Sequence, residues 1–295
     1  MNNKNLSGKI NFNYSLKKLN WFNIGGSAKI YFKPDTLQDL IEFLKLYQNE
    51  KNFFVLGAGS NVLFKDDIFD GAVIKLSKNF SRISLLNNNT IVAGSGALDK
   101  SLSEFAAEND LGGFEFLSCI PGTVGGGIRM NSGCFGSEFK DILISVQAIN
   151  RFGKVLTILK KDIIFDYRSC NLSKDLIFLS ASFQGNKKKK EEINEKIKNF
   201  KSKKEEAQPT RVKTGGSTFK NPIKQTDRKV WEIIKESIPS NIQFGDAIVS
   251  NKHANFFINK GNASYSDMKK LIDFVKESVR KKTGINLDLE IVLVE

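Results

Sequence analysis

The sequence predicts an α+β protein of two or three compact units. Strand-like and helix-like runs are mixed along the chain without regular alternation, which argues against a doubly wound parallel sheet. The 295 residues are 40% hydrophobic and 26% charged, an ordinary globular composition. Two glycine-rich loops, about 60 residues apart, each follow a strand-like run, and such loops let backbone N–H groups converge on an anion. We therefore expect a phosphate-rich ligand held between two subdomains.

The first unit is predicted to have the order β-α-β-β. Residues 1–20 are expected to be a polar lead-in, and the pair Gly25-Gly26 marks a turn. Asp35 is expected to cap a helix, because apolar residues follow it at helical spacing. The elements expected in order are a strand at 28–32, a helix over 37–47, a strand at 53–56, a glycine loop at 57–61 and a strand at 73–76.

The second unit follows without a clear linker, and a charged segment leads from it to the third. Residues 187–206 carry nine lysines and five glutamates, which favours a solvated helix or linker. Ser264 and Asp267 have capping-box spacing, and Gly284 is expected to end the helix that they begin. The elements expected are strands at 90–93, 146–149, 155–159, 178–183, 254–259 and 287–294, and helices at 98–106, 230–234 and 268–279.

The segment Ile120–Gly136 holds six glycines and one proline, with almost no helical period. A chain places that many glycines where its backbone approaches something closely or adopts a positive φ. A glycine-rich surface turn is the alternative, and the pattern alone does not decide between them. The earlier loop, 57–62, is a near miss for a dinucleotide fingerprint, because Val62 stands where the third glycine belongs. No P-loop motif is present, and a Rossmann site is not expected.

Charge and hydropathy narrow the class of protein. There is no run of 18 apolar residues and no signal-type start, so we expect a cytoplasmic protein that does not bind a membrane. The net charge of +13 would suit a nucleic-acid-binding protein. The basic residues carry no RNA-binding or helix-turn-helix signature, however. An attraction for anionic small substrates explains the charge equally well, and no nucleic acid is expected as a partner.

The few cysteines and the single histidine argue against zinc sites and limit the possible catalytic triads. Cys119, Cys134 and Cys170 match no zinc pattern and do not pair evenly. Cys134 and Cys170 are expected to be buried small residues with no redox role. The only histidine, His253, rules out a His-Glu-x-x-His site and would have to serve any Ser-His-Asp triad. No metal site is predicted.

Three polar residues stand out in otherwise apolar or glycine-rich surroundings. Arg168 follows an apolar stretch, Ser217 lies in a tight glycine turn, and Glu290 interrupts the apolar run 287–294. Each has a plain alternative. Arg168 would be an ion-pair partner, Ser217 a turn residue, and Glu290 an outward-facing strand residue. A serine without a nearby base is a poor nucleophile, although its hydroxyl can donate a proton.

Several motifs together resemble the UDP-N-acetylenolpyruvoylglucosamine reductase family, flavoenzymes that complete UDP-N-acetylmuramic acid in bacterial peptidoglycan synthesis. The resemblance runs from about Asn20 to the end of the sequence. One such motif would be weak evidence for the family, but six motifs in the family's order are a specific signal. They are 56–61, 120–126 with 130–133, 166–169, 216–222, 252–256 and Glu290, preceded by Gly25-Gly26.

The resemblance implies a fold and a cofactor. Two FAD-binding subdomains of the vanillyl-alcohol-oxidase type are expected at 1–77 and 78–186, a charged bridge at 187–206, and an α+β substrate domain at 207–295. FAD should be bound non-covalently, because relatives that attach it use a histidine and none precedes His253. The residues implied in FAD binding are Gly57, Ala58, Gly59, Ser60, Asn61, Pro121, Gly122, Thr123, Gly125 and Gly126.

The resemblance also implies a reaction. NADPH would reduce the flavin, and a hydride from flavin N5 would pass to C3 of UDP-N-acetylglucosamine enolpyruvate. Arg168 and Glu290 match family residues that stabilise the enolate, and Ser217 matches the proton donor to C2. A carboxylate in that place should be protonated or hydrogen-bonded to the enol, so we expect its pKa to be raised. Lys220, Asn221 and His253 match positions near the substrate, and a monomer is expected.

The chain departs from the family pattern at several places. Gly216 replaces a frequent cysteine, Val292 a frequent arginine and Glu295 a glycine. The short interval from Arg168 to Ser217 resembles the branch that lacks an inserted tyrosine loop. Two alternative functions stay open. A flavin oxidase for another alcohol or sugar would lack the set of Arg168, Ser217 and Glu290, and a nucleic-acid-binding protein would rest on net charge alone.

Overall fold

The computed structural model describes residues 6–47 and 52–295. The first five residues of the predicted lead-in lie outside this described part. The chain divides into two compact units. Unit 1 comprises residues up to 12, 30–58 and 71–204, and unit 2 comprises residues 13–29, 59–70 and 205–295. Each unit therefore collects segments that are far apart in the sequence, and the predicted domain boundaries stay a prediction.

A four-stranded sheet near the N-terminus has the strand order β1-β2-β5-β3. Its strands are β1 (Lys9–Ser15), β2 (Ser27–Lys33), β5 (Phe69–Ile74) and β3 (Phe53–Val55). The predicted order β-α-β-β is wrong, because β1 occupies the expected lead-in and β4 (Val62–Phe64) follows the glycine loop. Helix α1 (Leu37–Leu46) is capped by Thr36, whose hydroxyl accepts from the Asp39 N–H, and not by Asp35 as predicted. Its Phe43 ring stacks on Phe32 at 4.1 Å.

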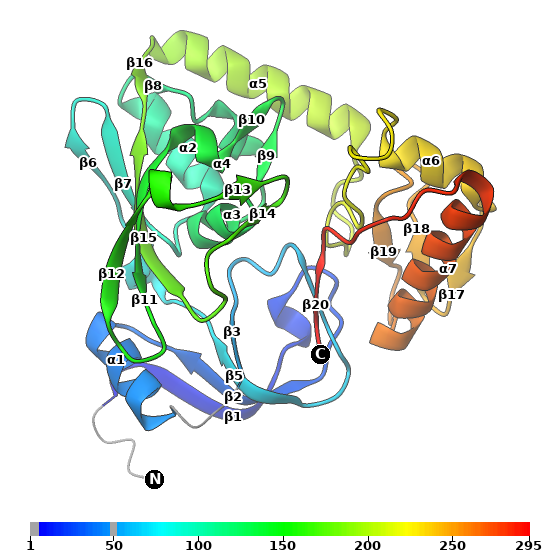
Figure 1. Ribbon diagram of the computed structural model, residues 1–295, viewed down its shortest axis with the longest axis horizontal. Helices are drawn as coiled ribbons and strands as arrows, with labels where there is room; N and C mark the ends of the chain where they lie inside the picture. The colour runs from blue at the N-terminus through cyan, green and yellow to red at the C-terminus, as the bar shows by residue number, and fades with distance from the viewer. Residues whose placement is uncertain (1–5, 48–51) are drawn as a thin grey trace. The chain divides into compact units, whose positions relative to one another are not determined.

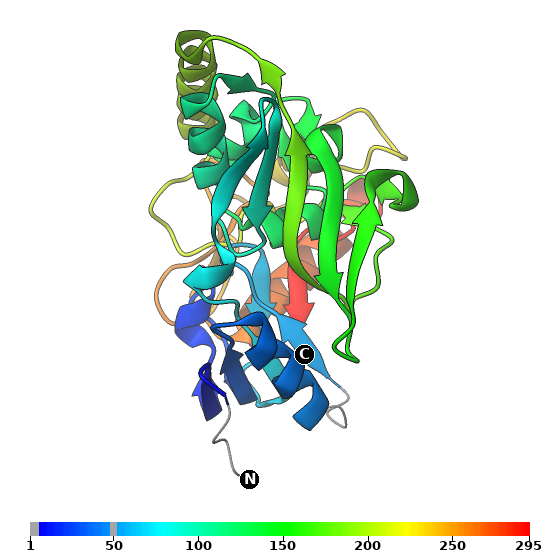
Figure 2. The same ribbon diagram turned by 90° about the vertical axis from the view of Figure 1, so that its left-hand side faces the viewer.

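A second, five-stranded antiparallel sheet forms the main body of unit 1 in the order β12-β11-β15-β7-β6. Helices α2 (Asp99–Glu108), α3 (Val124–Arg129) and α4 (Phe139–Ile142) lie on one face of it (Figure 1), and Figure 2 looks onto the other face. Four of the strands match the predictions, whereas β6 was not expected. The strands are β6 (Ile83–Asn87), β7 (Thr90–Gly94), β11 (Leu143–Ile149), β12 (Val155–Leu159) and β15 (Ile177–Gln184).

The glycine segment 120–136 contains helix α3 (Val124–Arg129), although its sequence shows almost no helical period. A Cβ atom on Gly127 would meet the Phe139 ring at 2.1 Å, so this glycine lets the helix pack against an aromatic core residue. The segment also contains β9 (Gly133–Cys134), and three short elements lie close to it in the sequence: β8 (Leu111–Gly112), the 3₁₀ helix η3 (Glu115–Cys119) and β10 (Ser137–Glu138). Close packing, as well as ligand approach, thus accounts for its glycine content.

The lysine-rich segment forms helix α5 (Lys190–Ala207), preceded by β16 (Asn186–Lys187). The predicted helix is confirmed, but it is not fully solvated, because Ile193 and Ile197 are buried against Ala107 of α2. The cysteine prediction is wrong in detail. Cys119 is buried, whereas Cys134 and Cys170 are only half-buried.

Unit 2 is built around helix α7 (Tyr265–Thr283), with the capping box at Ser264 and Asp267 and a left-handed Gly284 at its end, as predicted. It packs with helix α6 (Val230–Ser237) over a three-stranded antiparallel sheet in the order β17-β18-β19. The strands are β17 (Gln243–Phe244), β18 (Ala247–Val249) and β19 (Phe257–Asn259), the last shorter than the predicted 254–259.

The predicted strand 287–294 is also shorter in the structure. Only β20 (Val292–Val294) is a strand, and it pairs in parallel with β4. Glu290 therefore precedes the strand, and the expectation that it would interrupt one is wrong. Leu63 of β4 and Ile291 are both buried in the core of unit 2. The unit thus combines two segments from the first quarter of the sequence, 13–29 and 59–70, with residues 205–295.

Within residues 6–47 and 52–295, the helices are all too short or too polar to cross a bilayer. The same part of the chain contains no group of three or more histidine, cysteine or acidic residues that could hold a metal ion. The observed mixture of several sheets and helices confirms the predicted α+β class.

Candidate active site

Arg168 lies at the tip of a short hairpin in unit 1. Strands β13 (Phe165–Asp166) and β14 (Ser169–Cys170) pair antiparallel, with Asp166 opposite Ser169. Arg168 has φ +56°, a left-handed conformation that a non-glycine residue adopts only at some cost. The Asp166 carboxylate accepts the Tyr167 N–H at 2.7 Å and so stabilises the turn from within. The hairpin presents the arginine from a fixed backbone position.

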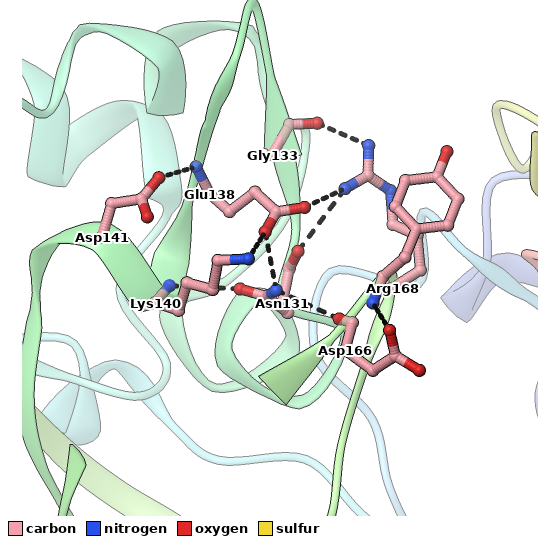
Figure 3. Close-up of polar contacts among 8 residues, drawn as sticks. Asn131, Gly133, Glu138, Lys140, Asp141, Asp166 and Arg168 are labelled. Atoms are coloured by element: carbon pink, nitrogen blue, oxygen red, sulfur yellow. Dashed lines mark hydrogen bonds and ion pairs between the residues drawn. The ribbon is translucent and has the colours of Figure 1, made fainter. Parts of the chain in front are cut away.

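The Arg168 guanidinium is held by three groups on one side (Figure 3). Its Nη2 donates to the Gly133 carbonyl at 2.7 Å, and its Nη1 lies 3.6 Å from a carboxylate oxygen of Glu138. The Nη1 also approaches the Asn131 carbonyl at 3.5 Å. The Arg168 side chain keeps 17% of its surface exposed. The ion pair that was the plain alternative for Arg168 is therefore present, and a partly exposed, oriented cation remains.

Asn131 is the buried residue that connects this network (Figure 3). Its Nδ2 donates to Glu138 at 3.0 Å and to the Asp166 carbonyl at 3.1 Å, while its Oδ1 accepts the Lys140 N–H at 3.1 Å. Asn131 also has a positive φ of 39°. One amide side chain thus fastens the hairpin, the glycine segment and α4 to one another.

The two predicted cofactor loops meet within unit 1. A Cβ atom on Gly57 would lie 2.5 Å from the Thr123 hydroxyl, and one on Gly122 would lie 2.6 Å from the Asp99 carboxylate. Both contacts are closer than real Cβ atoms make, so only glycine permits this approach of backbone to its neighbours. Pro121 and Gly126 are exposed, whereas Thr123 is buried. The loops therefore present bare backbone at the surface of unit 1.

Some backbone groups of these loops are already used. Gly125 donates its N–H to the Ser95 carbonyl at 2.9 Å, and Gly127 donates to the Thr123 carbonyl at 2.8 Å. A cation lies beneath the first loop, since Lys75 Nζ donates to the Gly57 carbonyl at 2.5 Å. Burial, followed by repulsion from Lys33, lowers the pKa of Lys75. Two positive charges thus lie near the Gly57 turn.

Asp99 is a buried polar residue that the sequence did not single out. It is fully buried at the start of α2, and neither carboxylate oxygen has a hydrogen-bond partner among the described residues. Burial raises the pKa of Asp99 well above its ordinary value. Since a charged carboxylate without partners would be very costly there, Asp99 is expected to be neutral in the folded protein.

The remaining residues of the first cofactor loop, Gly59, Ser60 and Asn61, belong to unit 2. Gly59 has φ +74°, and a Cβ atom there would overlap the Leu19 carbonyl at 2.1 Å. Asn61 donates from Nδ2 to the Glu290 carbonyl at 3.0 Å, and its own carbonyl accepts the Val292 N–H at 2.9 Å. Asn61 therefore fixes the backbone of a predicted catalytic residue.

Ser217 and Glu290 come together in unit 2 although 73 positions separate them in the sequence. The Glu290 N–H donates to the Thr218 carbonyl at 2.9 Å. Isolated bridges pair Ser217 with Phe256 and Phe219 with Leu289. Ser217 and Glu290 are both half-buried. The hydroxyl-bearing and carboxyl-bearing segments are thus adjacent and joined through backbone hydrogen bonds.

Asn255 is the buried residue that holds this junction. Its Oδ1 accepts the Phe219 N–H at 2.9 Å, and its Nδ2 donates to the Phe219 carbonyl at 2.8 Å. Its backbone carbonyl accepts the Thr218 N–H at 2.8 Å. The motif 252–256 therefore contributes a structural asparagine next to the predicted substrate residue His253.

The three predicted substrate residues occupy the same part of unit 2. Lys220 donates its N–H to the Asp288 carbonyl at 2.9 Å, and the Asn221 side chain accepts the N–H of Val230 at 3.0 Å at the start of α6. The His253 ring lies 5.9 Å from Trp231 and 4.8 Å from Phe256, between ring centroids. Burial lowers the pKa of His253, which favours a neutral imidazole.

The departures from the family pattern have local explanations. Gly216 has φ +78° with open space where a Cβ atom would be, so its backbone angle, and not crowding, favours glycine. Val292 donates its N–H to the Asn61 carbonyl, and the Glu295 carboxylate accepts a hydrogen bond from the Tyr265 hydroxyl. The replaced residues at the end of the chain thus stabilise unit 2.

The structure therefore brings Ser217, Glu290, Lys220, Asn221 and His253 into unit 2, and places Arg168 in unit 1. Sequence reasoning missed Asn131, Glu138, Asp99 and Asn255 as site residues. Asn131 and Asn255 lie inside the motifs 130–133 and 252–256, so these motifs could have pointed to them. Glu138 and Asp99 lie outside every motif, and nothing in the pattern signalled them.

Comparisons with known proteins agree with these motifs. Residues 208–294 match the model of the UDP-N-acetylenolpyruvoylglucosamine reductase C-terminal domain, and residues 28–159 match that of an FAD-binding domain. A curated relative from Pelagibacter ubique (strain HTCC1062), named UDP-N-acetylenolpyruvoylglucosamine reductase, is 62% identical over 290 residues. The match covers 98% of this chain and 96% of the relative. One from Rickettsia conorii (strain ATCC VR-613 / Malish 7) is 43% identical over 286 residues, covering 97% and 96%.

A solved structure agrees as well. The crystal structure of UDP-N-acetylenolpyruvylglucosamine reductase (MurB) from Thermus caldophilus is 28% identical, with a TM-score of 0.83, and covers 98% of this chain and 99% of that one. This likeness and the FAD-binding match confirm the predicted α+β flavin-binding fold. Because such relatives match the chain over nearly its whole length, it belongs to the UDP-N-acetylenolpyruvoylglucosamine reductase family.

Proposed function

We propose that this protein uses NADPH and non-covalently bound FAD to reduce UDP-N-acetylglucosamine enolpyruvate to UDP-N-acetylmuramate, a step of peptidoglycan precursor synthesis. Family membership and the FAD-binding match support the substrate and the cofactor. The positions of Arg168, Ser217 and Glu290 support the individual roles below. A monomer in the cytoplasm remains our expectation.

The residues of the glycine loops fit the pyrophosphate of FAD. At Gly57 and Gly122 the backbone lies so close to Thr123 and Asp99 that a Cβ atom has no room. Lys75 and Lys33 add positive charge near the Gly57 turn. Bare backbone and nearby cations favour a doubly charged phosphate group. These residues would hold the pyrophosphate, and a bound FAD would supply the hydride chemistry that links NADPH to C3 of the enolpyruvyl group.

Arg168 is proposed to stabilise the negative charge that develops on the substrate carboxylate. Glu138 and the Gly133 carbonyl occupy part of its guanidinium, which fixes the orientation of the remaining N–H groups. A donor that is oriented in advance does not have to reorganise as charge develops, and such donors contribute about 10²–10³-fold in rate. The neighbouring Glu138 reduces the net charge of the pair, so orientation is the larger part of this contribution.

Ser217 is proposed to donate a proton to C2 of the substrate, and Glu290 to stabilise the enol through a hydrogen bond. The observation that carries this assignment is the hydrogen bond from the Glu290 N–H to the Thr218 carbonyl, which makes the two segments neighbours. Asn61 and Asn255 hold the same segments from either side. Hydrogen bonds of the backbone around the serine and the glutamate therefore hold these two residues in position.

The test separates the two half-reactions of the Ser217→Ala variant. Stopped-flow absorbance should show flavin reduction by NADPH at the wild-type rate, because this step needs no proton at C2. Reoxidation by the enolpyruvyl substrate should slow by about 10²–10⁴-fold, the usual contribution of a positioned acid.

The matched control is Ser240→Ala, which removes an exposed hydroxyl from the same unit. It should leave both half-reactions unchanged. If the flavin of Ser217→Ala is reoxidised at the wild-type rate, Ser217 is not the proton donor. A protein that purifies without flavin, or fails to oxidise NADPH when the enolpyruvyl substrate is added, would contradict the proposed function itself.

A further inference from the structure

Arg129, the last residue of α3, binds a single loop of unit 1 through its guanidinium. Its Nη1 donates to the carbonyls of Leu172 and Ser173 at 2.6 and 3.0 Å, and its Nη2 donates to the Leu176 carbonyl at 2.9 Å. The guanidinium also lies over the Phe178 ring, 4.2 Å from its centroid. One side chain therefore fixes three carbonyl groups that belong to no strand.

This loop, residues 171–176, continues the hairpin that carries Arg168 and leads from β14 to β15. Its first residue, Asn171, closes the base of the hairpin. The Asn171 N–H donates to the Ile164 carbonyl at 3.0 Å, and the Asn171 side chain accepts the Ile164 N–H at 3.0 Å. Ile164 directly precedes β13. A displacement of the loop would therefore be transmitted to both strands of the hairpin.

The hairpin has a second anchor in the same glycine segment. The Asn131 side chain donates to the Asp166 carbonyl of β13 at 3.1 Å (Figure 3). Arg129 lies two positions before Asn131 and holds the chain just beyond β14. One anchor would leave the hairpin free to pivot, whereas two anchors on different strands fix its direction. The direction of the Arg168 hairpin thus depends on the segment that also contains the predicted cofactor turn.

The contact with three carbonyls suits an arginine. A guanidinium presents its N–H donors in a rigid planar fork and can reach several acceptors at once, whereas an ammonium on a flexible stem is a point charge. The hydrogen bonds to Leu172 and Leu176 are partly buried, and a buried carbonyl without a donor is costly. Satisfying these carbonyls is the plain role of Arg129, and the link to the hairpin gives it a further one.

We propose that Arg129 is a positioning residue for Arg168. By holding the loop 171–176 it fixes the hairpin, so that the Arg168 guanidinium keeps one orientation toward the substrate carboxylate. A displacement of about 1 Å at a reacting group can slow a reaction by about 10²-fold. The effect of Arg129 on turnover rests on the proposed function, whereas its effect on the hairpin does not.

Hydrogen–deuterium exchange of the full-length protein, read by mass spectrometry, tests the hairpin directly. In Arg129→Met, the amides of Ile164 and Asn171 should exchange about tenfold faster or more, because the loss of three hydrogen bonds eases local opening. Helix α7 in unit 2 should exchange at the wild-type rate. Wild-type exchange at these two amides, or equal acceleration throughout unit 1, would overturn the proposal.

A double-mutant cycle tests whether Arg129 acts through Arg168. Arg129→Met should slow reoxidation of the flavin by the enolpyruvyl substrate about 10–100-fold and leave flavin reduction by NADPH unchanged. In an Arg168→Lys background the same substitution should slow reoxidation by less than about threefold, because the group that it positions is already altered. An equal factor in both backgrounds would show that the two residues act independently, against the positioning role.

The remaining variants keep the two proposals separate. A wild-type flavin that the enolpyruvyl substrate does not reoxidise would contradict the proposed function, and the exchange measurement would still test the role of Arg129. Arg129→Lys serves if Arg129→Met does not fold. It keeps the charge but cannot reach three carbonyls, so it should also accelerate exchange at Ile164 and Asn171, and wild-type exchange there would contradict the proposal. The matched control, Arg82→Met at an exposed position of the same unit, should change neither measurement.

Discussion

The Arg168 region and the Ser217–Glu290 region are both organised by a buried asparagine, but in different ways. Asn131 contacts a carboxylate, a backbone carbonyl and a backbone N–H, and the carboxylate in turn pairs with Arg168. The Asn255 side chain instead hydrogen-bonds with two backbone groups, the N–H and the carbonyl of Phe219. The first network is charged and depends on side chains, whereas the second copies the hydrogen bonding of a sheet.

The difference follows from the groups that each network holds. A guanidinium carries charge and has a planar fork of donors, so other charged and polar side chains must orient it. A serine and a glutamate on adjacent segments need only a correct backbone. The Arg168 region should therefore tolerate substitution less well than the Ser217–Glu290 region.

The strongest test of this comparison removes each asparagine in turn. Asn131→Ala loses three hydrogen bonds in a buried place and puts alanine at a positive φ, so unit 1 should lose about 4 kcal/mol or more. Asn255→Ala loses two hydrogen bonds, and unit 2 should lose about 2 to 3 kcal/mol.

Urea unfolding can follow the two units separately. Both tryptophans, Trp21 and Trp231, belong to unit 2, so their fluorescence reports Asn255→Ala, while far-UV circular dichroism reports both variants. Asn262→Ala, an exposed control in unit 2, should change stability by less than about 0.5 kcal/mol. A larger loss for Asn255→Ala than for Asn131→Ala would break the comparison.

A second test keeps the positive charge at position 168 but removes the planar guanidinium group. Arg168→Lys cannot contact Gly133 and Glu138 in the same fork geometry, so enolpyruvyl-dependent flavin reoxidation should slow by about 10–100-fold, with folding intact. Flavin reduction by NADPH should not change. The control Arg82→Lys makes the same substitution at an exposed position of unit 1. If Arg168→Lys reoxidises at the wild-type rate, charge alone suffices and the fork geometry is irrelevant.

The smallest effect concerns Asp99, the buried polar residue that lacks partners. Its folded-state pKa is raised by burial above the ordinary 3.8. The folded state therefore holds a proton that the unfolded state releases, so its stability is full below that value and declines as the pH rises toward the folded pKa.

Asp99→Asn removes this titration while nearly preserving shape. Relative to wild type, the variant should gain up to about 1.4 kcal/mol between about pH 5 and about pH 6, as measured by urea unfolding at each pH. Asp110→Asn, at a position just after the same helix, makes the same substitution outside the core as a control. A stability difference that is independent of pH would show that Asp99 is charged in both states.

Local signals in the sequence predicted much of the fold. The capping box at Ser264 and the left-handed Gly284 are short-range features, and the structure confirms them. Strands β7, β11, β12 and β15 were predicted because each is a run of mostly apolar residues, although no residue of β12 is buried. Strand β4 was missed, because three apolar residues after a glycine loop become a strand only through β20, which lies 230 residues later.

The candidate site was predictable where a motif carried it. Ser217 and Glu290 came from such motifs, and the structure makes their segments neighbours through Thr218. Glu138 was not predictable, because its role depends on the distance to Arg168 and not on its own sequence context. Strand β1 was predicted as part of a polar lead-in, because polar residues alternate there with Phe12 and Tyr14, both of which are exposed.

The parallel pairing of β4 with β20 has a consequence for how the protein is made. Residues 59–64 leave the ribosome long before residues 292–294 are translated, and nothing else in the described chain pairs with β4. All segments of unit 1 are complete once residue 204 has emerged, about 90 residues earlier. Unit 1 can therefore fold during translation, whereas the unit that carries Ser217 and Glu290 must wait for its final strand. A nascent chain halted before residue 292 would present a finished arginine site beside an unfolded partner.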